Sequence, residues 1–129
     1  MNLHTKAAGY MLQLCNMFYE KNKDPNVETA ISSLRLVIMN GDCELTLGPL
    51  YPEILKFANN QRELLLKRDI GAFEYVPIPS RNLMGNNDKQ IFINIIEQSK
   101  KIYAELPDKN IFWEKINGLI AVVIKIHTL

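Results

Sequence analysis

Two histidines, His4 and His127, are the residues best suited to act as a general base or a metal ligand near neutral pH. They lie at opposite ends of the sequence, so no local motif such as HExxH contains them. Side chains close to chain ends are positioned poorly for catalysis. We therefore expect both histidines to be exposed to solvent and to bind no metal.

The other reactive side chains form no recognisable catalytic pattern either. No GxSxG motif and no phosphate-binding glycine loop occurs in the sequence. Three carboxylates, Glu53, Glu63 and Glu97, share their segments with Lys or Arg. We therefore expect them to be solvated or ion-paired surface groups without a catalytic role. Cys15 and Cys43 lack the spacing of a redox or zinc motif, so we expect buried free thiols. The sequence predicts a protein that is not an enzyme, with no catalytic residue, metal or cofactor.

A group of basic residues gives one functional hypothesis. It consists of Lys56, Arg62, Lys67 and Arg68, with two asparagines inside the same segment. Basic and amide side chains are the usual contacts to a nucleic-acid backbone. However, Glu63 interrupts the group, and the formal net charge of the whole chain is only +1, which gives no long-range field to attract a polyanion. Nucleic-acid binding is therefore an alternative, while a plain solvated helix face also explains these residues.

A long connection gives the preferred functional hypothesis. "FEYVPIPSRNLMGNND", residues Phe73–Asp88, exceeds the roughly 2 to 8 residues that usually join helices in bundles. Pro77 and Pro79 remove backbone donors and favour extended geometry, so they stiffen its first half. Leu83 and Met84 follow without a periodic apolar partner. They either contact a binding partner, as loop residues often do, or fold back as a lid on the core.

The predicted partner-binding surface combines this connection with the last helix. Its members are Tyr75, Arg81, Leu83, Met84 and an exposed Trp113. Trp, Tyr and Arg are the residue types that most often dominate the energy of protein interfaces. We therefore expect a small non-enzymatic protein-binding module, such as an inhibitor, an immunity factor or a subunit of a larger assembly. Its partner would be another protein or a second copy of the chain.

Apolar residues at helical spacing predict the elements that position these residues. The expected helices are 5–22, 25–40, a third from about Leu50 to before Gly71, a fourth from Asn87 to Leu106, and a fifth that Asp108 opens. Asp24 and Pro25 form a helix start, and Asn40–Gly41 forms a helix end. We expect an all-α fold, a single compact bundle of about five helices in one domain (1–129). The long connection lies between the third and fourth helices.

The run "GLIAVVIKI", Gly118–Ile126, has Lys125 as its only charged residue. A helix that is apolar on all sides must be surrounded, which predicts the central helix of the bundle or one half of an oligomer interface. Its β-branched residues also leave a buried strand open. The run is shorter than the roughly 20 residues needed to cross a bilayer, and the N-terminal segment lacks the charged leader of a signal peptide. We expect a cytoplasmic protein without membrane contact, and its Asn, Lys and Ile content is typical of phage, viral or low-GC bacterial coding sequences.

Overall fold

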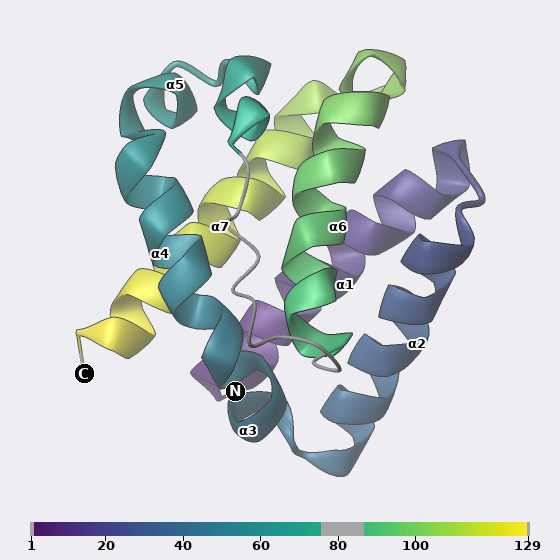
Figure 1. Cartoon of the computed structure of the whole chain (residues 1–129), viewed down its shortest axis with the longest axis vertical. Helices are drawn as coiled ribbons and strands as arrows, with labels where there is room; N and C mark the ends of the chain where they lie inside the picture. The colour runs from purple at the N-terminus through teal and green to yellow at the C-terminus, as the bar shows by residue number, and fades with distance from the viewer. Residues whose placement is uncertain (1, 76–86, 129) are drawn as a thin grey trace.

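The computed structural model describes residues 2–75 and 87–128, and for residues 87–89 it describes the backbone alone. Within these ranges the chain forms helices and no strand (Figure 1), which confirms the predicted all-α fold and excludes a strand at 118–126. The elements are α1 (Leu3–Lys21), α2 (Pro25–Asn40), α3 (Cys43–Leu47), η1 (Gly48–Leu50), α4 (Tyr51–Asn60), α5 (Arg62–Leu66), η2 (Ile70–Glu74), α6 (Asn87–Ile102), η4 (Tyr103–Glu105) and α7 (Lys109–His127).

Local capping chemistry fixes where the main helices begin and end. The carboxylate of Asp24 accepts the amide of Asn26 at 2.8 Å, and Pro25 occupies the first turn of α2. Gly41 ends α2 in the left-handed region, with φ of 73°. Asp108 accepts the backbone amides of Asn110 and Ile111 and so starts α7. These three boundaries agree with the sequence prediction.

Helix α1 organises the core, because it packs most extensively against α7 and α2 and also contacts α3 and α6. It buries one stripe of side chains: Ala7, Ala8, Met11, Leu14, Cys15 and Phe18. Gly118 of α7 faces Tyr10 of α1, and a Cβ atom added there would lie only 2.6 Å from the tyrosine ring. The glycine therefore permits the close approach of α1 and α7.

Trp113 belongs to an aromatic cluster in the interior. Its side chain is 1% exposed, and its Nε1 donates a hydrogen bond to the hydroxyl of Tyr103 at 2.9 Å. The rings of Phe73 and Phe112 also pack against it. The prediction that Trp113 is exposed is wrong, because the helical period places it with Phe112 and Ile116 on the buried side of α7.

Helix α6, and not the end of α7, has nearly all its faces covered. Between Gln90 and Ile102 its buried residues are Ile91, Phe92, Asn94, Ile95, Ile96, Gln98, Ser99 and Ile102. In α7, by contrast, Ala121 and Ile124 are exposed and Ile120 is only half-buried. The prediction that Gly118–Ile126 is the central helix of the bundle is therefore wrong, while its second interpretation, one half of an oligomer interface, stays a prediction. No helix in the described part of the chain is both long enough and apolar enough to cross a membrane.

The predicted third helix is divided into several elements. Gln61 interrupts it with φ of −107° and ψ of 19°, and its side-chain Nε2 donates to the carbonyl of Ala72 at 2.9 Å. The connection expected before it contains α3 and η1. The long connection is also shorter than predicted, because Phe73 is fully buried in η2. Residues 76–86, with Pro77, Pro79 and the segment from Arg81 to Met84, lie outside the described residues.

Candidate functional site: an apolar groove with a basic margin

A groove of about 850 Å³ lies between α4–α5 and the second half of α7. These elements form one side of the molecule, where the last turns of α7 extend past α4 (Figure 1). The groove is lined by Pro52, Leu55, Lys56, Ala58, Asn59, Arg62, Leu65, Leu66, Arg68, Asn117, Ile120, Ile124 and His127.

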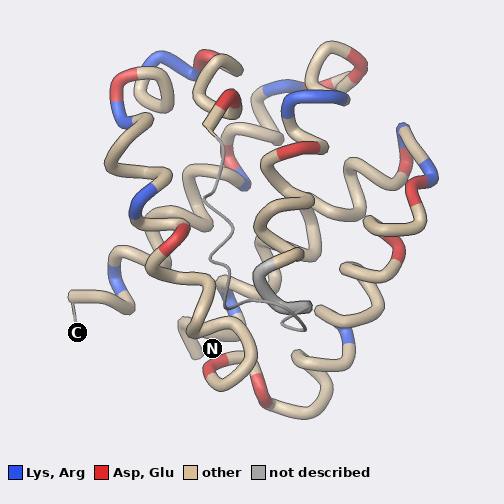
Figure 2. Tube along the Cα trace, in the orientation of Figure 1, with Lys and Arg blue, Asp and Glu red and all other residues tan. Residues whose placement is uncertain are grey.

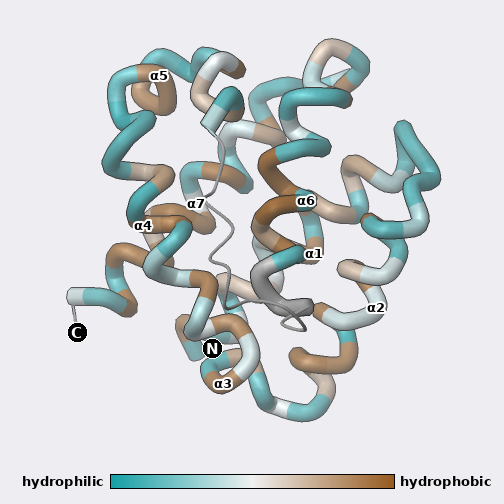
Figure 3. Tube along the Cα trace, in the orientation of Figure 1, coloured by the Kyte–Doolittle hydropathy of each residue, from teal (hydrophilic) through white to brown (hydrophobic). Residues whose placement is uncertain are grey.

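The floor of the groove is apolar. Leu55 of α4 faces Ile120 and Ile124 of α7, which are four residues apart and therefore share one helix face. Leu66 at the end of α5 keeps 75% of its surface exposed, and Ile124 keeps 45%. Figure 3 shows hydrophobic segments on both sides of this region. Large apolar side chains gathered at one exposed depression, with polar residues around them, are typical of interaction sites.

The margin of the groove is basic. Lys56, Arg62, Arg68 and His127 contribute to the lining, and none of the described residues that line the groove is acidic. Lys56 is partly neutralised, since its Nζ lies 3.6 Å from a carboxylate oxygen of Glu53. No ion pair of the described residues involves Arg62 or Arg68. Figure 2 shows the basic positions along α4 and α5. The two arginines are the strongest candidates to receive an anion.

The structure brings together three of the four residues predicted for nucleic-acid contact. Lys56, Arg62 and Arg68 line the groove. Lys67 is exposed but does not line it. The lining residues Asn59, Arg62 and Leu66 recur at helical spacing, and Lys67 falls outside that spacing. The basic residues were thus identified from the sequence, but one of the four lies outside the groove.

The predicted partner-binding set does not form a surface within the described residues. Tyr75 ends η2 and is half-buried, with its ring edge-to-face against Phe57 at 5.6 Å between centroids. Burial raises the pKa of this tyrosine above its usual value. Trp113 is in the core. Arg81, Leu83 and Met84 lie outside the described residues, so their role stays a prediction.

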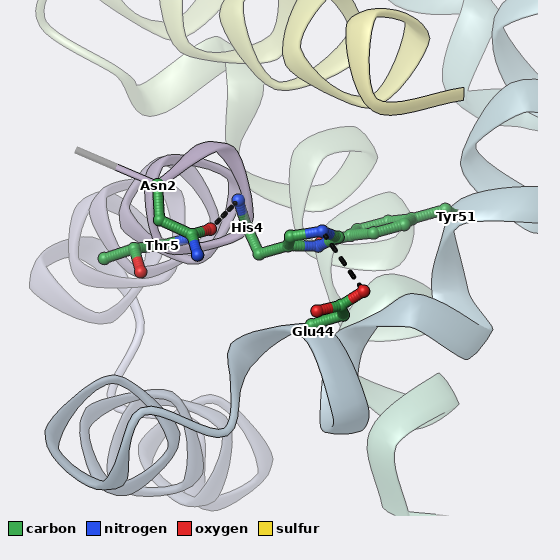
Figure 4. Close-up of polar contacts among 5 residues, drawn as sticks. All are labelled: Asn2, His4, Thr5, Glu44 and Tyr51. Carbon is green, nitrogen blue, oxygen red and sulfur yellow. Dashed lines mark hydrogen bonds and ion pairs between the residues drawn. The ribbon is translucent and has the colours of Figure 1, made fainter. Parts of the chain in front are cut away.

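A second polar site joins the first turn of α1 to α3 and α4. The Nδ1 atom of His4 shares a hydrogen bond of 2.9 Å with the hydroxyl of Tyr51, and Nε2 lies 3.8 Å from Glu44 (Figure 4). The side chain of His4 is only 19% exposed, so its predicted full exposure is wrong. The helix begins at Leu3, because Asn2 accepts the amides of His4 and Thr5, and this fixes the histidine. His127 is exposed, as predicted.

This polar site is suited to holding helices together. Burial raises the pKa of Tyr51 to about 12, and the nearby Cys43 and Glu44 add to the effect. The phenol is therefore neutral at physiological pH. Within residues 2–75 and 87–128, no three His, Cys, Asp or Glu side chains are placed to hold a metal ion. Cys15 and Cys43 are buried free thiols, as predicted, and burial raises the pKa of Cys15 to about 12.

The apolar half of the groove was missed by sequence analysis. Leu55 and Leu66 lie off the inward stripe of the predicted third helix, and Ile120 and Ile124 belong to the run that was assigned to the bundle centre. The available signal was the excess of apolar residues around the whole circumference of that run, which also predicted an interface as its second interpretation.

Comparison of the chain with protein-family models, with curated proteins and with solved structures finds no match.

Proposed function

We propose that this protein is a non-enzymatic binding module whose groove receives an acidic amphipathic helix of a partner protein. The observation that carries the proposal is an apolar floor bordered by Arg62 and Arg68, with no carboxylate side chain among the lining residues in the part of the chain that the structure describes. Apolar side chains of the partner would cover Leu55, Ile120 and Ile124, while its acidic side chains would meet the two guanidinium groups.

A helix is the occupant that fits this arrangement best. The groove lies between helices α4–α5 and α7, and amphipathic helices bind hydrophobic grooves with anchors at positions i, i+3, i+4 and i+7. Its volume of about 850 Å³ accepts several large side chains. Each apolar anchor that is fully buried there contributes about 1.5–3 kcal/mol before the cost of association. The floor therefore supplies affinity.

The basic margin determines the specificity for the partner. Exposed charges at the edge of an interface raise association rates and reject partners of like charge more than they add affinity. Arg62 and Arg68 can each donate two parallel hydrogen bonds to one carboxylate, a geometry that Lys cannot reproduce. A helix with Glu or Asp on both sides of its apolar face complements this margin, whereas a basic helix is repelled.

The alternative occupant is a nucleic-acid backbone that contacts Lys56, Arg62, Lys67 and Arg68. Phosphates would satisfy these cations but leave Leu55, Ile120 and Ile124 without a partner. The apolar floor thus favours the protein helix. The two occupants differ in their response to salt, because binding to phosphates weakens steeply as salt rises and binding centred on apolar anchors does not.

Selection of peptides from a random 16-residue library displayed on phage tests the proposal. We expect enriched peptides with apolar residues spaced by three or four positions and flanked by Asp or Glu. These peptides should bind the Leu45→Glu protein normally, because Leu45 is 80% exposed on α3 and lies outside the groove. They should lose binding to the Ile124→Glu protein.

Two results would contradict the proposal. One is a set of selected peptides that bind the Ile124→Glu protein as well as the original protein. The other is a selection that enriches no acidic helical peptide, while a labelled single-stranded oligonucleotide binds in a strongly salt-dependent way and loses affinity on Arg62→Ala. The second result would assign the basic residues to nucleic acid.

A further inference from the structure

Arg68 has an unusual backbone conformation. Its φ of 53° lies in the left-handed region, and it is the one residue other than glycine with positive φ in the described ranges. The Cβ atom of an L-residue crowds the backbone there, so this conformation is ordinarily left to glycine or asparagine. Glycine, which has no Cβ atom, would adopt this conformation without strain.

The end of α2 provides an internal comparison. Gly41 and Asp42 donate their amides to Ile38 and Val37, at 3.3 and 3.0 Å. At the end of α5, Arg68 and Asp69 donate theirs to Leu65 and Leu64, at 3.1 and 2.9 Å. Both helices therefore end in the same Schellman motif.

At the left-handed position of this motif, the chain uses glycine after α2 and arginine after α5. The turn itself does not need the arginine side chain. A function of the Arg68 side chain would therefore lie outside the turn.

The arginine side chain reaches from the end of α5 to the start of α7. Its Nη1 atom donates to Oδ1 of the exposed Asn110 at 3.4 Å, a long bond, and Arg68 also lines the groove. A guanidinium has five N–H donors, so this contact leaves most of them available. Arg68 is therefore a groove-lining residue with donors left over to meet a carboxylate.

We infer that Arg68 is the specificity-determining residue of the groove, which receives one carboxylate of the acidic partner helix and thereby fixes the register of that helix. The inference rests on the proposed function. Residues held in sparsely populated backbone regions concentrate at binding and catalytic sites, where the conformation is retained at the expense of stability. Replacement of Arg68 by glycine therefore has opposite effects on folding and on recognition.

The test uses the tightest acidic peptide from the phage selection, labelled for fluorescence anisotropy, and urea unfolding followed by Trp113 fluorescence. Arg68→Gly should move the unfolding midpoint to higher urea and raise the Kd of the peptide about tenfold, as loss of a charge-assisted hydrogen bond does. Arg68→Lys, which keeps the charge and the strain, should recover part of the affinity without any gain in stability. Lys67→Ala, which alters a neighbouring cation outside the groove, should leave the Kd unchanged.

Glu-to-Gln replacements along the peptide identify the receiving carboxylate. One replacement should raise the Kd about tenfold on the original protein and have no effect on the Arg68→Gly protein, because the partner charge is then already absent. That coupling would not arise if Arg68 served only to join α5 to α7.

The failures of the two ideas are distinguishable. If Ile124→Glu abolishes peptide binding while Arg68→Gly binds normally, the inference about Arg68 is wrong and the proposed groove remains. If the peptide binds normally to the Ile124→Glu protein, the proposed function itself is wrong. If Arg68→Gly shifts the midpoint to lower urea, the arginine stabilises the fold through Asn110 and the inference is overturned.

Discussion

Adjacent residues of α7, Leu119 and Ile120, should lose very different amounts of stability on the same substitution. Leu119 is 2% exposed and packs in the core, whereas Ile120 is half-buried in the apolar floor of the groove. We compare Leu119→Asp with Ile120→Asp. The two changes introduce the same charge into the same turn of one helix, so helix propensity and net charge cancel in the comparison.

The expected magnitudes differ by several kcal/mol. Leu119→Asp loses about 1.5–3 kcal/mol of side-chain burial and adds several kcal/mol for a carboxylate without a partner in the core. That sum approaches the roughly 5–15 kcal/mol that stabilises an ordinary domain. Ile120→Asp can turn its carboxylate into the open groove, and it loses only part of its apolar contact, at a cost of about 1 kcal/mol.

Urea unfolding followed by the fluorescence of Trp113 measures both variants. Trp113 is the single tryptophan and lies in the aromatic cluster, so its emission reports the packing of α7. We expect a cooperative native transition for Ile120→Asp and its loss or near loss for Leu119→Asp. Unfolding of Ile120→Asp would refute the groove and would support the prediction from sequence that this run is the centre of the bundle.

Three further outcomes are expected. Tyr103→Phe removes the acceptor of the indole N–H of Trp113 and should cost about 1–3 kcal/mol in the same urea experiment, and an unchanged midpoint would contradict that hydrogen bond. Because the pKa of Tyr51 is raised to about 12, the folded state holds the phenolic proton more tightly than the unfolded state. The stability that this group contributes is full below about pH 10 and is lost as the pH rises towards 12. Tyr51→Phe should flatten that part of the pH–stability curve, and an equal slope in both proteins would contradict the raised pKa of Tyr51. Cys15, whose pKa is also raised to about 12 by burial, should react with a thiol reagent at pH 8 only as fast as the protein opens, and rapid labelling of the folded protein would show that the site is accessible.

Local chemistry made much of the fold predictable. Asp24 followed by Pro25 starts α2, and Gly41 ends α2 because glycine adopts the left-handed conformation freely. Asp108 starts α7, because its side chain accepts backbone amides of the first turn. Gln61, at the boundary between α4 and α5, has its side chain hydrogen-bonded to the carbonyl of Ala72, eleven residues away. No pattern within one helical period contains that contact, so the division into α4 and α5 could not be predicted.

The groove illustrates a limit of hydrophobic periodicity. Ile120 and Ile124 are as apolar as core residues. A pattern of apolar residues does not distinguish a helix face that lines an open groove from one that the chain itself covers. The exposed assignment of Trp113 came from the frequency of tryptophan in interfaces, although the helical period of α7 places this residue on the buried side. Arg62 and Arg68 were recognisable as basic residues, but the left-handed backbone of Arg68 has no signature in the sequence, because glycine or asparagine is expected there.

Methyl NMR spectroscopy of the isoleucine and leucine side chains shows whether the groove between α4–α5 and α7 binds the peptide. On addition of the selected acidic peptide, we expect the largest shifts at Leu55, Leu66, Ile120 and Ile124, which line the groove. Leu36 and Leu45 are also exposed, on α2 and α3, and should keep their positions. Shifts centred on Leu36 or Leu45, with the groove methyl groups unchanged, would contradict the proposal that the groove binds an acidic helix.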